Sequence, residues 1–411
     1  MNDRASARSP LAALIGQTSV ATFATEVWSR NHLVRRAGDG PDLTRLFTVD
    51  DADTLLSSHA LRTPFLRIAK DGVVAPASSF TRSGGIGATV GDQVDADQVT
   101  RLLVDGSTVV FQGLHRAWPS IQAFTTDLTL DLGHPVQANA YLTPASARGF
   151  AAHYDTHDVF VIQLSGSKHW TIHSPVIDVD AGLVEWTQNR SKVESAAATE
   201  PVFDGLLEQG DVLYLPRGWI HAARAAEATS LHLTLGVHPY TERHVLDAII
   251  ADALADMRVD RSLPVGVDVA DPDSLAATIE ELRRSVIGAL ASVKAEDVAA
   301  RLARRRGQDV RSHPLRPVAQ AEAVTSQAGS DPAPVVLREG FMPRVAEHHE
   351  GVTLHLDGME LPFRSDHAAA LRQIVSGVEC RSVALPGLDE VAGRDLIRAL
   401  LVAGVVVPVG P

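Results

Sequence analysis

The sequence predicts a mixed α+β protein, with an all-β domain followed by a helical region and a small C-terminal domain. Between about residues 100 and 240, short runs of Val, Ile, Leu, Phe and Thr alternate with turn residues, as in a β-sandwich or barrel. After Pro239 the apolar residues change to helical spacing. The length of 411 residues allows two or three such domains.

Six segments of the all-β domain are predicted strands, because β-branched and aromatic residues recur in them between turn signals. In three of them a face with polar groups opposes an apolar face. Ser230, His232 and Thr234, for example, share one face of their strand, and leucines share the other. A closed barrel with a polar interior would suit a charged small molecule. The predicted strands are residues 109–112, 137–142, 159–164, 168–173, 212–215 and 230–237.

The rest of the chain divides by composition and periodicity. Two amphipathic helices, over 244–257 and 275–293, form either a packing layer or a dimer surface. A segment rich in Pro, Ala, Gln and Ser indicates a linker. Near the end, a strand, two helices capped by Ser365 and Asp389, and a last strand suggest a winged helix. The predicted parts are a barrel domain (1–240), a helical region (241–310), a linker (311–345) and a winged-helix-like domain (346–411).

Composition argues against several classes of protein. With 50 acidic and 37 basic residues the net charge is −13, which disfavours general nucleic-acid binding. The single cysteine, Cys380, excludes an intrachain disulfide and suits a reducing compartment. No apolar run approaches the roughly 18 residues of a membrane span. We expect a soluble, cytoplasmic protein that binds neither membrane nor nucleic acid directly.

A metal site is predicted from three residues. His153 and Asp155 project to the same side if their segment is a strand. His221 follows a strand and a tight turn at 216–218, which fixes its position as a third ligand. A His-x-Asp sequence alone, or a histidine after such a turn alone, often occurs by chance. Here both occur in one β domain, which favours a shared metal site. Two histidines and one carboxylate leave three metal positions open, as in non-haem Fe(II) oxygenases.

Lys168 is a second indicator of a ligand. It alternates with Trp170 and Ile172 on an apolar strand face, where a cation is costly unless an anion pairs with it. The alternative is that its side chain extends to the edge of the barrel. A dicarboxylate would pair with Lys168 at one end and chelate the metal at the other.

Several segments together resemble the JmjC-type cupins of the ribosomal oxygenase branch, which are Fe(II)- and 2-oxoglutarate-dependent hydroxylases. The resemblance implies a double-stranded β-helix (cupin or jelly-roll) core, a helical dimerisation region, and a winged helix that does not read DNA. It is strongest over 135–240 and extends loosely over most of the chain. The segments that carry it are 139–144, 153–155, 159–170 and 210–221.

By this resemblance, His153, Asp155 and His221 are the iron ligands. Lys168 pairs with the distal carboxylate of 2-oxoglutarate. The other residues that line the same pocket are Asn139, Tyr141 and Thr234.

One position departs from the family pattern. Relatives vary at position 157, and this chain has His157 there. It shares strand parity with His153 and Asp155. Three roles remain open for it: a substrate-side wall, a hydrogen-bonded structural histidine, or a metal ligand. The metal role ranks last, because three alternating residues of one strand cannot all bind one octahedral ion without strain.

The sequence therefore predicts an enzyme, a dioxygenase that uses Fe(II), 2-oxoglutarate and O2. Its expected substrate is a side chain of a protein or peptide, with a ribosomal protein as first candidate, and it is expected to be a homodimer. A hydroxylase of a small molecule or natural product is the main alternative. Two further alternatives are a non-catalytic ligand-binding cupin and a winged-helix regulator.

Overall fold

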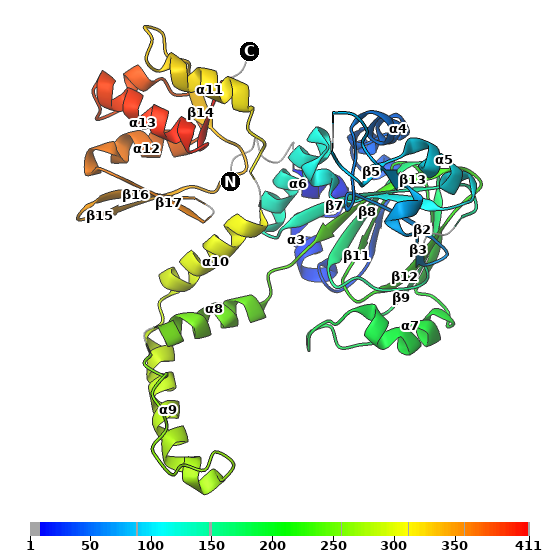
Figure 1. Ribbon diagram of the computed structural model, residues 1–411, viewed down its shortest axis with the longest axis horizontal. Coiled ribbons are helices and arrows are strands. Elements are labelled where there is room, and N and C mark those ends of the chain that lie inside the picture. Colours follow the sequence, from blue (N-terminus) through cyan, green and yellow to red (C-terminus); the bar gives the residue numbers. More distant parts are fainter. Residues whose placement is uncertain are drawn as a thin grey trace. The chain divides into compact units, whose positions relative to one another are not determined.

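The computed structural model describes residues 9–87, 89–147, 150–255, 257–310, 312–356 and 358–409 (Figure 1). The chain divides into two compact units, Met1–Pro239 and Tyr240–Pro411. Each unit has its own buried apolar cluster. None of the helices in these ranges combines the length and the hydrophobicity that crossing a membrane requires.

Two antiparallel sheets form the frame of the first unit. The larger has the strand order β1-β11-β8-β13-β7-β6-β2-β3, and the smaller has the order β10-β9-β12. A short β4-β5 pair lies apart from both. The strands are β1 (Leu33–Arg35), β2 (Leu66–Lys70), β3 (Val73–Val74), β4 (Thr81–Arg82), β5 (Gln93–Val94), β6 (Thr108–Phe111), β7 (Val136–Thr143), β8 (Asp158–Ser165), β9 (Lys168–His173), β10 (Phe203–Leu207), β11 (Val212–Leu215), β12 (Ile220–Ala225) and β13 (Ser230–Val237).

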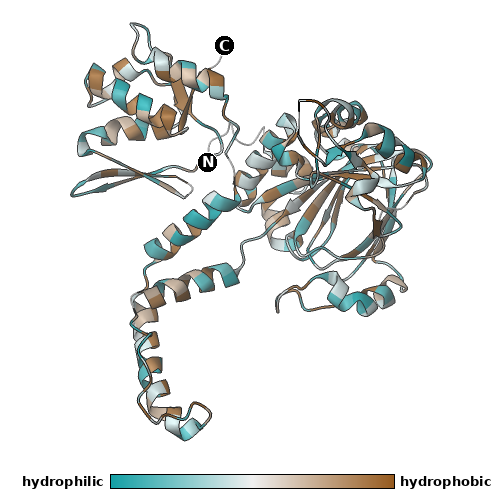
Figure 2. Ribbon diagram, in the orientation of Figure 1, coloured by the Kyte–Doolittle hydropathy of each residue, from teal (hydrophilic) through white to brown (hydrophobic). Residues whose placement is uncertain are grey.

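All six predicted strands are present, as β6, β7, β8, β9, β11 and β13, with ends within one residue of expectation. Their alternation sorts the side chains as predicted. Leu231, Leu233 and Leu235 of β13 join the large apolar cluster, whereas His232 and Thr234 line a cavity. Figure 2 shows how strongly hydrophobic residues concentrate on these strands.

Helices contribute to the same apolar cluster from the other side of the large sheet. Leu14 of α2 and Leu128 of α6, for example, belong to it. Side-chain caps begin several of these helices: Asp95 accepts hydrogen bonds from the first backbone amides of α5, and Thr48 and Asp51 form a capping box on α4. The helices are α2 (Pro10–Ile15), α3 (Val20–Thr22), α4 (Val49–Ser58), α5 (Ala96–Val104), α6 (Pro119–Leu132) and α7 (Arg190–Ala197).

Gly166 makes the turn that leads from β8 into β9 and so sets the position of Lys168. Its φ is +63°, and a Cβ there would lie 2.3 Å from the carbonyl oxygen of Thr229. We expect Gly166→Ala to lower the free energy of unfolding by on the order of 1–3 kcal/mol, because both the backbone and the contact are strained. Urea unfolding would measure it. Gly133→Ala is the control, since Gly133 has a similar φ but open space around its Cβ; equal losses would show that the contact contributes nothing.

The second unit begins with three helices and continues into a small α/β arrangement. The helices predicted over 244–257 and 275–293 are confirmed as α8 and α9. In the C-terminal part, β15, β16 and β17 form one sheet and β14 pairs with β18. The elements are α8 (Glu242–Ala255), α9 (Pro272–Ser292), α10 (Ala295–Asp309), α11 (Pro317–Ser326), β14 (Val335–Leu337), β15 (Arg344–His348), β16 (Gly351–Leu356), β17 (Met359–Phe363), α12 (Ala368–Val375), α13 (Glu390–Val402) and β18 (Val406–Pro408).

The segment 311–345, predicted as a linker, is instead partly built into the C-terminal domain. It contains α11 and β14, whose residues Ala323 and Val335 are buried in the C-terminal apolar cluster. The Gln320 amide donates to the carbonyl oxygens of Leu401 and Val406, at 2.7 and 2.8 Å. Small alanines pack closely against α13 without the strong apolar periodicity that would have indicated a helix from the sequence.

Candidate metal and ligand site

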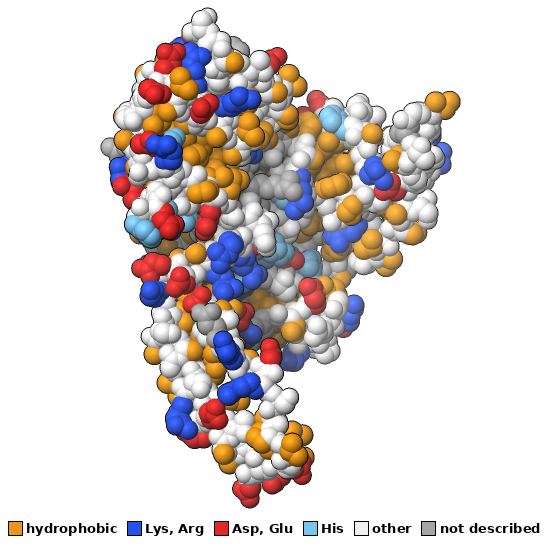
Figure 3. Space-filling model, turned by 60° about the vertical axis from the view of Figure 1, so that its left-hand side comes forward, with side chains coloured by type: hydrophobic (Ala, Val, Ile, Leu, Met, Phe, Trp, Pro, Cys, Tyr) orange, Lys and Arg blue, Asp and Glu red, His pale blue; other side chains and the backbone are white. Residues whose placement is uncertain are grey.

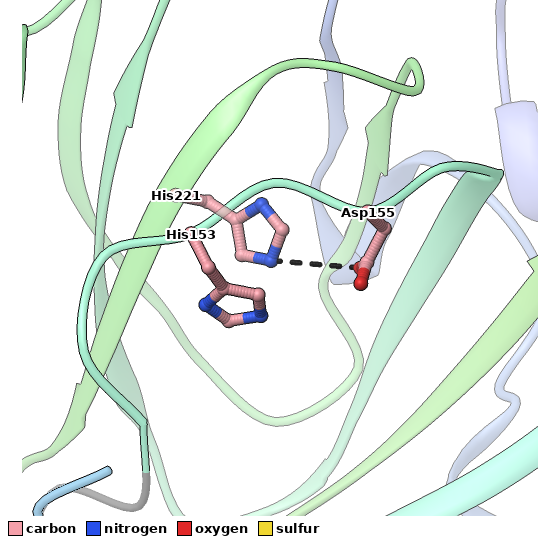
Figure 4. Close-up of side chains that lie close together, drawn as sticks. All are labelled: His153, Asp155 and His221. Atoms are coloured by element: carbon pink, nitrogen blue, oxygen red, sulfur yellow. Dashed lines mark ion pairs between the residues drawn. The ribbon is translucent and has the colours of Figure 1, made fainter. Parts of the chain in front are cut away.

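Three side chains converge on one point, at one end of the cavity in the first unit. One ligand atom from each of His153, Asp155 and His221 lies within 4.8 Å of the others. Nε2 of His221 is 3.7 Å from Oδ2 of Asp155, and the two imidazole centroids are 4.5 Å apart. Figure 4 shows both rings and the carboxylate directed toward the same space. This donor set suits a divalent transition metal with open coordination positions.

The segment that carries two of these residues is not the regular strand that we expected. His153 and His221 form an isolated antiparallel bridge, with N–H to O=C distances of 3.1 and 2.8 Å in the two directions. The chain then leaves the strand conformation, and β8 begins only at Asp158. His153 and Asp155 therefore converge through a bridge and a bend, not through the two-residue period of a strand.

Backbone carbonyls orient both imidazole rings. Nδ1 of His153 lies 2.8 Å from the carbonyl oxygen of Ala151, and Nδ1 of His221 lies 3.1 Å from that of Trp219. A carbonyl oxygen can only accept, so each Nδ1 carries the proton and each Nε2 keeps its lone pair. Burial lowers the pKa of His221 to about 4, and the neighbouring His153 adds to this. The ring is thus neutral at pH 7, as a metal ligand must be.

A cavity of about 300 Å³ extends from the three residues between the two sheets. Val159 and Val161 of β8 line one wall, and Trp170 and Ala223 of the small sheet line the other. Of the four residues expected to line a ligand pocket, three do so: Lys168, Tyr141 and Thr234.

Lys168 is buried at the far end of the cavity from the metal ligands. On the β9–β12 register, Ile172 pairs with His221, so Lys168 lies four residues away, or about 13 Å of strand. Its Nζ donates to Oγ1 of Thr143 at 3.1 Å and lies 3.3 Å from Nδ1 of His232. No carboxylate among the described residues pairs with it, and burial lowers its pKa to about 7. The alternative that the Lys168 side chain extends to the edge of the barrel is excluded, because this side chain is buried and lines the cavity.

Tyr141 lies against the same end of the cavity. Its ring stacks on His232, its cross-strand partner, at a centroid distance of 4.7 Å and an interplanar angle of 1°. Burial raises the pKa of Tyr141 to about 12, with Asp155 contributing, so the phenol keeps its proton and can donate. Asn139 does not line the cavity. Its Oδ1 instead accepts a hydrogen bond from the Gly113 amide at 2.9 Å.

His157 lines the cavity but lies outside the group of three ligands. Its ring stacks on His238 at 4.7 Å. It also approaches Gly236 so closely that a Cβ there would lie 2.7 Å from the ring. This placement favours a wall of the cavity over a metal ligand.

Sequence reasoning missed several cavity residues. Arg67 of β2 lines the cavity, and its guanidinium carbon lies 5.2 Å from the centre of the Phe150 ring. The sequence did contain a signal for Arg67. It lies between Leu66 and Ile68, which are both buried, so alternation along the strand places the arginine on the opposite face. Other cavity residues that sequence reasoning missed include Thr108, Phe150 and Trp186.

The fold and the site together are those of a cupin-type domain with a candidate metal site of two histidines and one carboxylate. Residues 118–245 match the JmjC domain family, a range that includes all three ligands and Lys168. The chain thus contains a JmjC domain, as the resemblance implied.

Relatives of known name share this region. A Dictyostelium discoideum protein named bifunctional lysine-specific demethylase and histidyl-hydroxylase NO66 is 31% identical over 239 residues, which cover 58% of this chain and 44% of that protein. Ribosomal oxygenase 1 of Gallus gallus is 32% identical over 226 residues, covering 54% and 35%. The chain thus spans less than half the length of these relatives.

A solved structure matches nearly the whole chain. The ribosomal oxygenase YcfD of Escherichia coli aligns over 95% of this chain and 98% of its own, with a TM-score of 0.56 and 17% sequence identity. A complex of that protein with cobalt and 2-oxoglutarate aligns over 96% and 99%, with a TM-score of 0.54 and 16% identity. At 16–17% sequence identity, these structural matches establish the fold alone.

Proposed function

We propose that this protein is an Fe(II)- and 2-oxoglutarate-dependent oxygenase that hydroxylates a protein side chain. The observation that carries the proposal is one cavity with three convergent metal ligands at one end and a buried, anion-free lysine at the other. The names of the relatives support it, as does the complex of YcfD with cobalt and 2-oxoglutarate.

The residues present fit both groups. His153, Asp155 and His221 would hold the iron, since each offers a free donor atom of the correct kind. Lys168 would bind the far carboxylate of 2-oxoglutarate through a charge-assisted hydrogen bond. When bound, iron and 2-oxoglutarate supply the activation of O2, with succinate and carbon dioxide as products.

The protein itself positions these groups and excludes water. Val159, Val161 and Trp170 are buried side chains that give the cavity apolar walls. Tyr141 is a protonated donor, and Thr234 a hydroxyl, beside the co-substrate position. His157 is proposed as a wall on the substrate side, with no role as a ligand.

Arg67 gives the cavity a second cation besides Lys168. Its Nε is buried, and no hydrogen-bond partner for it occurs among the described residues. It therefore favours a substrate side chain, or an adjacent peptide group, that offers an oxygen acceptor. A ribosomal protein is the first candidate substrate because of the relatives' names, and the charge of −13 agrees with a basic partner.

The experiment that tests the proposal uses purified protein loaded with Fe(II), with 2-oxoglutarate, ascorbate and isolated ribosomal proteins. Intact mass spectrometry should show one added oxygen on a ribosomal protein, with a matching yield of succinate. Succinate formed only with a metabolite would favour the small-molecule alternative. The absence of any 2-oxoglutarate binding or turnover would favour a non-catalytic cupin.

The affinity for 2-oxoglutarate should depend on pH through Lys168. With its pKa near 7, Lys168 is protonated below that value and binds an anion there, and affinity falls as the pH rises. The facing groups do not oppose this, because His232 is kept neutral by burial and Thr143 does not ionise. We expect calorimetry to show roughly tenfold weaker binding at pH 8 than at pH 6. In Lys168→Arg the dependence should disappear; a dependence retained there would assign it to another group.

The C-terminal domain is proposed to be a winged-helix-like module without a DNA-reading role. Its helix α13 carries Glu390, Arg394, Asp395 and Arg398, a balanced set of charges. The Arg394 side chain is occupied, since it donates to the carbonyl oxygens of Gln327 and Gly329. The helix therefore offers no basic face to a phosphate backbone. We also propose that the protein is cytoplasmic, as expected from its sequence.

A homodimer is proposed from the helices α8 and α9. Large apolar side chains along both are 40–50% exposed, including Leu246, Ile250, Ile279 and Leu282. Figure 3 shows hydrophobic side chains on the surface at the lower end of the molecule, where α9 lies. Burial of such faces against a second copy would remove them from water.

Leu282→Glu is expected to shift the protein from dimer to monomer, because a buried unpaired carboxylate opposes association. Light scattering should then give the mass of one chain, 43.8 kDa, in place of twice that mass. Ala291→Glu on the opposite face of α9 is the matched control and should remain dimeric. An unsubstituted protein that is monomeric at micromolar concentration would refute the dimer.

A further inference from the structure

Asp158 is a buried carboxylate that the proposed reaction does not use. It is the first residue of β8 and lies three positions after the ligand Asp155. Its Oδ1 accepts a hydrogen bond from the backbone amide of Arg217 at 2.8 Å, and the Ser29 hydroxyl lies 3.4 Å from Oδ2. Burial raises the pKa of Asp158, so the site bears the cost of a buried acid and gains a fixed acceptor.

The amide that Asp158 holds belongs to the turn at 216–218. In the same turn, the Gly218 amide donates to the carbonyl oxygen of Asp155 at 2.9 Å. Gly218 has a φ of +81°, which a side chain would strain. Two hydrogen bonds therefore fasten the turn to the segment 155–158, one at each end of that segment.

The turn leads directly to the third ligand. The carbonyl oxygen of Trp219, the residue after the turn, orients the His221 ring through Nδ1. His221 also pairs through its backbone with His153. The spacing between Asp155 and His221 thus depends on the turn being held at Arg217 and Gly218.

We infer that Asp158 is a positioning residue that fastens the 216–218 turn and so sets the geometry of the metal ligands before any metal binds. The inference rests on the proposed metal site and adds to it a residue that does not touch the metal. The requirement is for an acceptor oxygen at this position, not for a negative charge. Asparagine should therefore replace aspartate, because its Oδ1 can accept from Arg217 and its Nδ2 can donate to neighbouring hydroxyl oxygens.

The test is calorimetric titration of Co(II) into the metal-free full-length protein, with a thermal melt of each variant. Asp158→Ala should bind Co(II) about 10–100-fold more weakly than the unsubstituted protein, as expected when an outer partner of a metal ligand is lost. Asp158→Asn should stay within about threefold. Equal affinity in Asp158→Ala, or equal loss in both variants, would overturn the inference.

Asp211→Ala is the matched control. Asp211 is also buried, and it accepts from the amides of Ala37 and Glu208, away from the ligand segments. It should lower the melting temperature without changing the Co(II) affinity. A comparable loss of affinity there would mean that general destabilisation explains the effect of Asp158→Ala, and the inference would be wrong.

Two further outcomes are possible: the Asp158→Ala variant fails to fold, or the unsubstituted protein binds no Co(II). Should Asp158→Ala fail to fold, hydrogen exchange of the unsubstituted metal-free protein replaces it. Slow exchange of the backbone amides of residues 217–221 supports a turn held before metal binding, and exchange as fast as in an open loop overturns it. An unsubstituted protein that binds no Co(II) would refute the proposed metal site itself, which distinguishes that failure from failure of the positioning role alone.

Discussion

Alanine in place of His153, Asp155 or His221 is expected to abolish iron-dependent turnover of 2-oxoglutarate while leaving the fold intact. Each residue provides one of three donors around one point, and with two donors the site would lose more than the 10–100-fold in metal affinity that loss of an outer partner typically costs. The fold should survive because these side chains line a cavity and contribute little to the main apolar cluster. Succinate formation, Co(II) titration and a thermal melt measure the three effects.

His157→Ala is the natural control for this series. It lies in the same cavity and near the same ligands, yet its ring stacks on His238 and belongs to no ligand group. It should retain metal affinity, and any effect should fall on the primary substrate. Full activity in His221→Ala together with loss of iron in His157→Ala would exchange the roles of these two residues.

The strands and the three convergent side chains of the candidate metal site could be predicted from the sequence because both leave local signals. Alternation of side chains along β13 follows from a sheet with one face toward apolar helices and one toward a polar cavity. The group of His153, Asp155 and His221 is recognisable by residue type and by the turn before His221. The resemblance to JmjC cupins drew on the same residues, and the JmjC match over 118–245 confirms it.

What could not be predicted depends on contacts between distant segments. The bend after His153 is held by the amide of Gly218, and nothing in the local sequence indicates that bond. Asn139 was expected at the cavity, but its amide oxygen is engaged by Gly113, 26 residues earlier in the chain. Arg67 reaches the cavity only because β2 lies at one side of the large sheet, next to β6.

Composition misled at 311–345 for a related reason. Alanine, glutamine and proline resemble a linker when each residue is judged alone. In the structure, Pro317 begins α11, Ala323 allows close packing, and the Gln320 side chain satisfies two carbonyl oxygens at the end of α13 and in β18. The segment is therefore ordered by its contacts with α13 and β18, which are distant in the sequence and cannot be recognised from the segment itself.

Replacing Lys168 by alanine is expected to raise the 2-oxoglutarate requirement strongly. A buried carboxylate left without its cation costs on the order of 3–5 kcal/mol, or roughly 10²–10³ in affinity at its lower end. Co(II) affinity should change little, because Lys168 lies about 13 Å of strand away from the residue that pairs with His221. Titration of 2-oxoglutarate into the Co(II)-loaded variant measures the first effect, and titration of Co(II) alone measures the second.

An unchanged affinity for 2-oxoglutarate would show that another cation holds the far carboxylate. Arg148 lies outside the described residues. Arg217 is not among the cavity residues, and its backbone amide donates to Asp158. Arg67 does line the cavity and becomes the first candidate in that event. Arg67→Met distinguishes the two cases: if Lys168 binds the co-substrate, Arg67→Met leaves 2-oxoglutarate affinity within a few-fold and impairs only the hydroxylation of the primary substrate.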